Sequence, residues 1–180
     1  EKIIFACHFP FVNFPGMYFA RIHQERSYVL ALKDASQVNG MYMGAEKGDY
    51  SFRNYGEYLL LGGMGHRTGK NAGSYEALRK AAEKWFPNSQ EIYHWSAQDC
   101  MTLDKIPYIG QYSKENPDWY VATGFQKWGM TTAMVVALIL RDLICGQEVF
   151  YKDVFSPSRF SLGNIPALLA ETGHSIKGLG

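Results

Sequence analysis

The stretch WYVATGFQKWGMTTAMVVALILRDLIC at residues 119–145 decides the fold. Residues 119–123 are typical of a strand, and residues 124–130 form a loop with two glycines and two aromatic residues. Residues 131–145 are apolar at nearly every position. This last segment predicts a buried helix, because a helix without a polar face has to be covered by protein.

The start of this helix is a candidate binding site for a flat ligand. We expect Thr131 or Thr132 to cap the helix. Its first turn leaves four backbone N–H groups unpaired and carries the positive end of the helix dipole. Gly124 and Gly129 would let a ligand approach the backbone closely. A flavin fits, because its reduced form gains negative charge. An ordinary corner between a strand and a helix explains the same residues equally well.

The first part of the chain predicts an antiparallel sheet. Strand-like runs alternate with turn residues, and the alternation is clearest where Tyr28, Leu30 and Leu32 share one face. The expected strands cover residues 2–7, 17–23, 27–33, 41–43, 50–54 and 57–61.

A change of period marks the next segment. A helix is predicted at residues 74–86, with Ser74 as its N-cap and Pro87 as its stop signal. A strand follows at residues 91–95, and residues 107–110 are typical of a tight turn. These elements predict an α+β fold with a mostly antiparallel sheet.

The composition excludes several classes of protein. Lys and Arg number 18 against 17 Asp and Glu, a balance that argues against a nucleic-acid-binding protein. The longest apolar run, residues 133–140, is shorter than the ~20 residues that a membrane span needs. Cys7, Cys100 and Cys145 lie far apart in the sequence, which indicates reduced thiols and a cytoplasmic protein.

Other residues with chemical potential carry weaker signals. The glycine-rich residues 62–69 could hold an anion or face a ligand, but a plain connection between a strand and a helix is the simplest interpretation. The five histidines lack metal-ligand spacing, so no metal site is expected. Cys100 beside Asp99 could be a nucleophile, although a structural thiol is the favoured interpretation.

Several motifs together resemble the C-terminal part of the D-amino acid oxidase/glycine oxidase family of FAD-dependent oxidoreductases. They are Trp95-Ser-Ala-Gln-Asp99, Pro107-Tyr-Ile-Gly110, Tyr120-Val-Ala-Thr-Gly-Phe125 and Gly129-Met-Thr131. Residues 96–99, 125–129 and 155–159 resemble one branch of the family, whose members carry an additional C-terminal Rieske iron–sulfur domain.

The resemblance implies a division of the chain into parts of a flavoprotein. Residues 1–8 would end a strand of the FAD-binding domain, and residues 9–95 would form the antiparallel substrate domain. Residues 96–160 would be the C-terminal part of the FAD-binding domain, followed by a linker at residues 161–180. The dinucleotide fingerprint is not in this sequence, so the chain would be a fragment that binds FAD weakly or not at all by itself. A [2Fe-2S] cluster would belong to a missing downstream domain, and an N-terminal FAD-domain segment would complete the fold.

The resemblance also assigns candidate site residues. Those expected to bind the pyrimidine edge of the flavin are Gly124, Phe125, Gln126, Lys127, Trp128, Gly129, Met130, Thr131 and Thr132. Trp128 would lie near the substrate as well, and Tyr50 and Arg53 could face the substrate from a sheet strand.

Asp99 departs from the family pattern, because glycine oxidase has an arginine there that binds the substrate carboxylate. A carboxylate would instead attract an amine, or Asp99 could be a structural acid that caps a turn. The implied function is oxidation of an amine or amino-acid-like substrate by hydride transfer to flavin. The alternative is a non-catalytic ligand-binding or scaffold module with the same fold.

Overall fold

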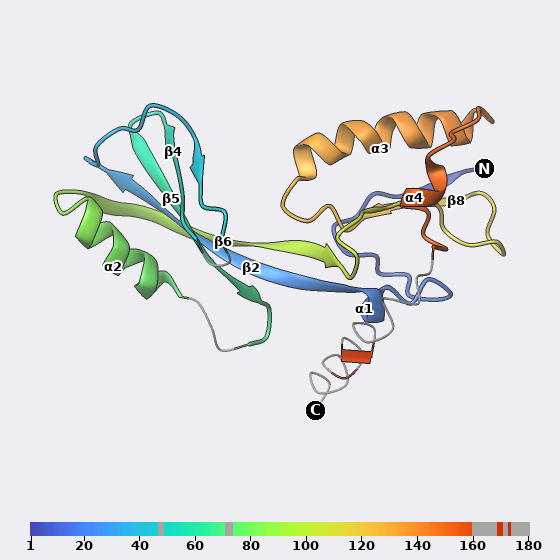
Figure 1. The fold of residues 1–180 in the computed structure, drawn as a ribbon, viewed down its shortest axis with the longest axis horizontal. Helices are drawn as coiled ribbons and strands as arrows, with labels where there is room; N and C mark the ends of the chain where they lie inside the picture. The colour runs from blue at the N-terminus through green and yellow to red at the C-terminus, as the bar shows by residue number, and fades with distance from the viewer. Residues whose placement is uncertain (47–48, 71–73, 160–168, 171–172, 174–180) are drawn as a thin grey trace. The chain divides into compact units, whose positions relative to one another are not determined.

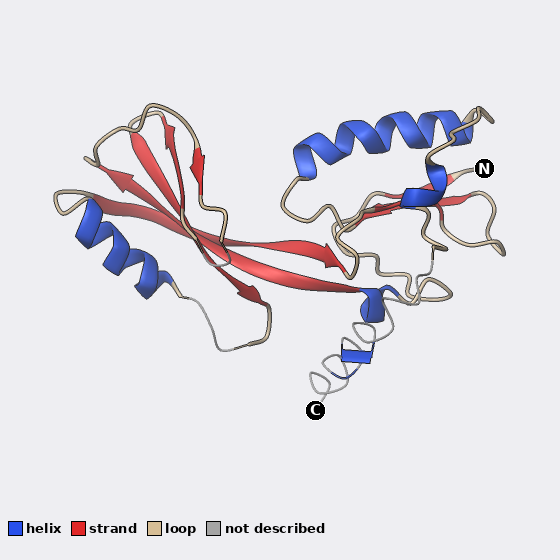
Figure 2. Ribbon diagram, in the orientation of Figure 1, coloured by secondary structure: helices blue, strands red, loops and turns tan. Residues whose placement is uncertain are grey.

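The computed structural model describes residues 1–46, 49–70 and 74–159, together with residues 169, 170 and 173. The chain forms two compact units (Figure 1). Unit 1 consists of Glu1–Gln24 and Asp99–Gly180, and unit 2 consists of Glu25–Gln98. The structure confirms an α+β protein whose sheets are mostly antiparallel (Figure 2).

Unit 2 is built on a five-stranded sheet with the strand order β3-β4-β5-β2-β6. The strands are β2 (Ile22–Lys33), β3 (Tyr42–Met43), β4 (Ser51–Tyr55), β5 (Tyr58–Arg67) and β6 (Gln90–Thr102). Helix α2 (Tyr75–Trp85) follows β5, with Ser74 at its N-cap position as the sequence predicts. Strand β6 is longer than the predicted residues 91–95.

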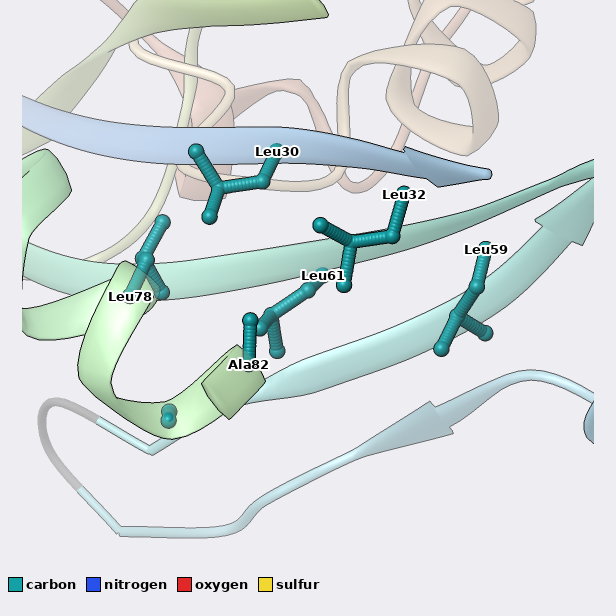
Figure 3. Close-up of a cluster of buried hydrophobic side chains, with 7 residues drawn as sticks. Leu30, Leu32, Leu59, Leu61, Leu78 and Ala82 are labelled. Carbon is teal, nitrogen blue, oxygen red and sulfur yellow. The ribbon is translucent and has the colours of Figure 1, made fainter. Parts of the chain in front are cut away.

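The core of unit 2 lies between α2 and one face of the sheet (Figure 3). Antiparallel pairing places Leu30 opposite Leu61 and Leu32 opposite Leu59, so that these alternate residues of β2 and β5 share one face. Leu78 of α2 packs on this face, and all five leucines are almost fully buried. The predicted alternation along residues 28–32 is therefore confirmed.

The sequence suggested that the glycine-rich residues 62–69 connect a strand to a helix. In the structure, residues 62–67 are instead the second half of β5. They pair with β2, and Gly62 also pairs with Ser51 of β4. A Cβ atom at Gly62 would meet the Ser51 Oγ atom at 2.6 Å. The glycine is therefore explained by the close approach of neighbouring strands rather than by a phosphate-binding loop.

Unit 1 contains a three-stranded sheet with the order β1-β8-β7. Strand β1 (Ile3–Phe5) runs parallel to β8 (Trp119–Thr123), and β7 (Tyr108–Gln111) runs antiparallel to it. The prediction of a turn at residues 107–110 is wrong, because Tyr108 and Ile109 are buried ladder residues of β7. The described residues of this unit also form the helices α1 (Tyr18–Arg21), α3 (Gly129–Ile144) and α4 (Lys152–Phe155).

The compact units differ from the division expected from the sequence, because residues 9–24 belong to unit 1. Residues 17–23 were expected to be strand, but Tyr18–Arg21 form α1 with Met17 at its N-cap position, and β2 begins at Ile22. Tyr18 and Ile22, four residues apart, pack in one cluster with Cys100 and Val121. The expected linker at residues 161–180 lies outside the described residues, except for three helical positions at 169, 170 and 173.

Helix α3 corrects another expectation, because it is apolar but not buried. Of its residues only Ile139 and Leu140 are buried, whereas Met130 is 89% and Met134 68% exposed. One side of α3 packs on β7 and β8, and the rest has no cover among the described residues. In this part of the chain no helix has the length and apolar character needed to cross a membrane.

Candidate functional site

Unit 1 contains a cavity of about 330 Å³ at one edge of its sheet. Three segments that are far apart in the sequence form its walls: residues 6–8, residues 99–100 and the loop from β8 to α3. The lining residues are Ala6, Cys7, His8, Asp99, Cys100, Thr123, Gly124, Phe125, Gln126, Lys127 and Gly129.

The parallel pairing of β1 and β8 explains why these segments meet. Both strands end at the same edge of the sheet, at Phe5 and Thr123. The residues that follow each strand therefore emerge side by side, and ligands commonly bind at such an edge. This arrangement supplies two of the three walls, namely residues 6–8 and the loop from β8 to α3.

The loop at 124–128 is held against the end of β6 through Gln126. The Gln126 N–H donates to the Cys100 carbonyl at 3.1 Å, and the Gln126 Nε2 donates to the Thr102 Oγ1 at 2.9 Å. Gln126 itself has a left-handed backbone conformation with φ of 55°, which these two bonds fix in place. The loop thus has a defined path into the start of α3.

The two glycines of this loop have different environments. Gly124 has φ of 74°, and a Cβ atom there would meet the Thr102 Cγ2 atom at 2.3 Å. Gly124 is thus required by the fold itself. A Cβ atom at Gly129, in contrast, would have no atom within 4 Å. The space beside Gly129 is open to a ligand, whereas the space beside Gly124 is filled by protein.

The start of α3 differs from the prediction in how it is capped. Its N-cap residue is Trp128, which makes no capping hydrogen bond with its side chain. The Thr131 hydroxyl donates to the Trp128 carbonyl at 3.1 Å instead of capping a backbone N–H group. The first N–H groups of α3 therefore lack a side-chain cap, and Gly129 and Met130 in this turn are exposed.

The wall formed by residues 6–8 was not predicted as part of a site. The His8 carbonyl accepts two hydrogen bonds of 2.9 Å, from the Cys100 thiol and from the Thr123 hydroxyl. Both donors are buried, with 2% of each residue exposed. The missed signal was topological: a short strand at residues 3–5, parallel to β8, has to deliver the following residues to the same edge.

Asp99 and Lys127 form an ion pair at the cavity, with 2.8 Å between the Asp99 Oδ2 and the Lys127 Nζ. Their side chains are 28% and 41% exposed. The negative charge of Asp99 is thus compensated within the protein. Burial, followed by the nearby charge of Asp99, raises the pKa of the Cys100 thiol to about 12. Cys100 accordingly stays protonated at neutral pH, as a structural thiol does and a nucleophile does not.

The structure brings together only some of the predicted site residues. Residues 124–127 and Gly129 line the cavity with Asp99, whereas Trp128, Met130, Thr131 and Thr132 do not. Trp128 is 61% exposed. Tyr50 and Arg53 belong to unit 2, where the Tyr50 ring packs edge-on against Trp85 at 4.8 Å and Arg53 is exposed on β4. Among the residues that the structure describes, no three His, Cys, Asp or Glu side chains cluster as a metal site requires.

The sequence of this chain is similar to a known protein family and to a protein of Bacillus subtilis. Residues 6–143 match the model of the DAO family, described as FAD dependent oxidoreductase. The Bacillus subtilis (strain 168) protein YhfW, whose name describes a Rieske 2Fe-2S iron-sulfur protein, is 41% identical over 171 residues. That match covers 90% of this chain and 34% of the relative, so the chain spans about a third of the relative's length.

Solved structures share the fold at lower sequence identity. Glycine oxidase from Geobacillus kaustophilus has a TM-score of 0.72 at 18% identity, over 89% of this chain and 46% of that one. L-Proline dehydrogenase from P. horikoshii has a TM-score of 0.70 at 22% identity, over 90% and 47%. At such identities the likeness concerns the fold.

Proposed function

The chain belongs to the DAO family of FAD-dependent oxidoreductases, and we propose that it forms the flavin-ring and substrate part of an enzyme that oxidises an amine or amino-acid-like substrate. The single observation that carries the proposal is the cavity of unit 1, where the loop at 124–128 leads into the uncapped start of α3. Unit 2 would then be the substrate domain, and unit 1 the C-terminal part of the FAD-binding domain.

The residues of the cavity fit a flavin ring. The open space beside Gly129 would admit a flat ring, and the uncapped N–H groups of the first turn of α3 would bond its pyrimidine edge. We propose that residues 124–132 hold this edge, with the Thr131 hydroxyl and the exposed Trp128 at its border. When bound, the flavin supplies a two-electron acceptor for the hydride of a C–H bond next to nitrogen.

The fixed backbone of the loop is what this chain contributes to the chemistry. Gln126 is hydrogen-bonded to Cys100 and Thr102, which fixes the loop before α3. The backbone N–H donors at the start of α3 therefore do not have to reorganise when a bound ring gains negative charge. Preorganised donors of this kind stabilise a developing charge more than mobile ones do. The residues would therefore favour the reduced state of the ring.

The ion pair alters the substrate role that the sequence suggested for Asp99. With the Lys127 ammonium 2.8 Å away, Asp99 is not a free anion that would select a cationic amine. We propose that the pair presents one charge of each sign to the site. Tyr50 and Arg53 stay proposed substrate residues from unit 2, with Arg53 able to bind a carboxylate.

The partners that we propose follow from the exposed surface of α3 and from the relatives. A further segment of the FAD domain would cover the apolar side of α3 that carries Met130 and Met134. The name of the Bacillus subtilis relative supports a [2Fe-2S] domain elsewhere in the full-length protein. The free cysteines support a cytoplasmic location.

The proposal is tested by the flavin content of the full-length protein. We expect the purified protein to be yellow, and Gly129→Val to lose most of its flavin, because the added methyl groups fill the space beside the helix start. Gly40→Val is the matched control, since Gly40 is exposed and an added Cβ meets nothing closer than 3.9 Å. Absorbance at the flavin bands per protein, with circular dichroism as a check on folding, measures both variants.

Two results would contradict the proposal. Full flavin occupancy in a folded Gly129→Val variant would remove the start of α3 from the binding site. A colourless wild-type protein that takes up no FAD would favour the alternative, a non-catalytic ligand-binding or scaffold module.

A further inference from the structure

His8 combines a fixed backbone with an exposed side chain at the cavity. The backbone of His8 is fixed, because its carbonyl accepts bonds from Cys100 and Thr123. The residue is nevertheless exposed and lines the cavity. Within the described part of the chain, the His8 imidazole makes no hydrogen bond or ion pair. The backbone of the residue is thus held at the cavity, while its imidazole has no polar partner among the described residues.

Most of the other ionisable groups that line the cavity already take part in an ion pair or a hydrogen bond. Asp99 and Lys127 neutralise each other at 2.8 Å. Cys100 donates its thiol proton to the His8 carbonyl, and its raised pKa keeps it protonated. Cys7, two residues after the end of β1, is half-buried and offers a thiol, which is a weak hydrogen-bonding group. Imidazole is the side chain that ordinarily exchanges a proton near neutral pH.

We propose that His8 is a redox-linked proton acceptor, which takes up a proton when the flavin in this cavity is reduced. The inference rests on the proposed function. Reduction of a flavin by two electrons and one proton adds one negative charge to the cavity. Uptake of a second proton from solvent by the neutral imidazole gives an imidazolium and cancels that charge. Overall, two electrons and two protons enter the site.

Charge balance is the physical reason for this role. A net charge in a partly enclosed cavity is costly unless an opposite charge lies nearby. Lys127 already compensates Asp99, so a reduced ring that shared this ammonium would leave the cavity with one uncompensated negative charge. The His8 imidazole can change its charge without breaking a hydrogen bond or ion pair of the described residues.

The test is the pH dependence of the flavin midpoint potential in the full-length protein, measured by spectroscopic titration between about pH 7 and 8. Each proton taken up changes the equilibrium constant tenfold per pH unit, which for two electrons is about 30 mV. We expect a slope of about 60 mV per pH unit in the wild type and about 30 mV in His8→Gln, since one proton fewer is then taken up. His8→Asn is a second variant with the same expectation. Both variants keep the carbonyl that Cys100 and Thr123 bond, so the fold does not depend on the imidazole.

His94→Gln is the control, because His94 lies in unit 2, where its imidazole is bonded to Glu91. We expect it to keep the wild-type slope. Equal slopes in the wild type and in a flavin-loaded His8→Gln variant would overturn the role of His8 and leave the proposed function intact. Absence of FAD from the wild-type protein would overturn both.

Discussion

The two longest helices among the residues that the structure describes use their apolar residues in opposite ways. Helix α2 buries Leu78, Ala81 and Ala82 against the sheet of unit 2 and exposes its polar side. Helix α3 is more apolar in sequence but buries only Ile139 and Leu140. Unit 2 contains both layers of its own core, whereas the described residues of unit 1 cover only one side of α3.

We infer from this difference that unit 2 is stabilised by its own residues, whereas α3 needs a further apolar surface to cover it. A helix that is apolar on all sides is stable when protein surrounds it, and exposed apolar patches mark contact surfaces. We therefore expect the stability of unit 2 to be set by its own residues. For α3 we expect a large part of the stability to come from a covering surface.

The largest effect is expected in the core of unit 2. Leu61→Ala should destabilise this unit by about 2–5 kcal/mol, because a fully buried leucine leaves a cavity between α2 and the sheet. Peptide-resolved hydrogen exchange of the full-length protein would show faster exchange of the amides of β5. If α3 and β8 lost protection equally, the distinction between the two units would be broken.

The next effect is expected at the loop of unit 1. Gly124→Ala should cost about 2–4 kcal/mol, because a left-handed backbone disfavours alanine and the new Cβ would clash with Thr102. The thermal midpoint and the protection of β8 measure the loss. Gly129→Ala is the control and should leave stability unchanged, since its Cβ has open space. Equal stability of the two variants would refute the assigned difference between the glycines.

A smaller and pH-dependent effect is expected at Asp104, which also stabilises unit 1. Burial raises the pKa of Asp104, but hydrogen bonds from Arg159 and from the Ile106 N–H outweigh this, so that the pKa lies below its ordinary value. A carboxyl with a lowered pKa stabilises the fold above its unfolded-state pKa, and this contribution disappears as the pH falls through the folded-state pKa.

Asp104→Asn should therefore cost about 1–3 kcal/mol at pH 7, where Arg159 loses its bidentate partner. The difference from the wild type should shrink below about pH 4. Thermal unfolding followed from pH 7 to pH 3 checks both statements. A constant difference over this range would show that the loss comes from packing and not from charge.

The smallest effect on the 180-residue chain is expected at Leu138, which is 47% exposed on α3. Leu138→Ser should change the stability of this chain by no more than about 0.5 kcal/mol. In the full-length protein the same change should cost clearly more and reduce flavin loading, because a covering segment would contact the side chain. Equal effects in the two proteins would contradict the proposed cover on α3.

Much of the fold could be predicted from local patterns. The alternation of Leu30 with Leu32 and the helical spacing at 75–85 each report one buried face, and the structure confirms both. The expectations that failed concern segments whose structure depends on pairing with a distant strand. Residues 62–67 are strand because β2 pairs with them, and β7 is strand because β8 does, although Pro107 and Gly110 suggest a turn. Local residue preferences do not encode the pairing of distant strands.

The candidate site likewise contains residues that the sequence indicated and residues that only strand pairing brings to it. The pattern of strand, glycine loop and apolar helix pointed to residues 124–129, and the resemblance pointed to Asp99; their roles in binding stay predictions. Neither signal pointed to residues 6–8, because the resemblance identified residues 1–8 only as the end of a strand and gave them no role in a site. They join the site through the parallel pairing of β1 with β8, which links residues more than a hundred positions apart.

By itself the sequence determined the α+β class, the amphipathic α2 and the loop that enters α3, since each depends on the period of neighbouring residues. Only the tertiary structure decided that residues 6–8, 99–100, 123–127 and Gly129 surround one cavity and that Lys127 neutralises Asp99. The physical reason is that a site is made by side chains brought together through strand order and register. These are fixed by the packing of the whole unit and not by any one segment.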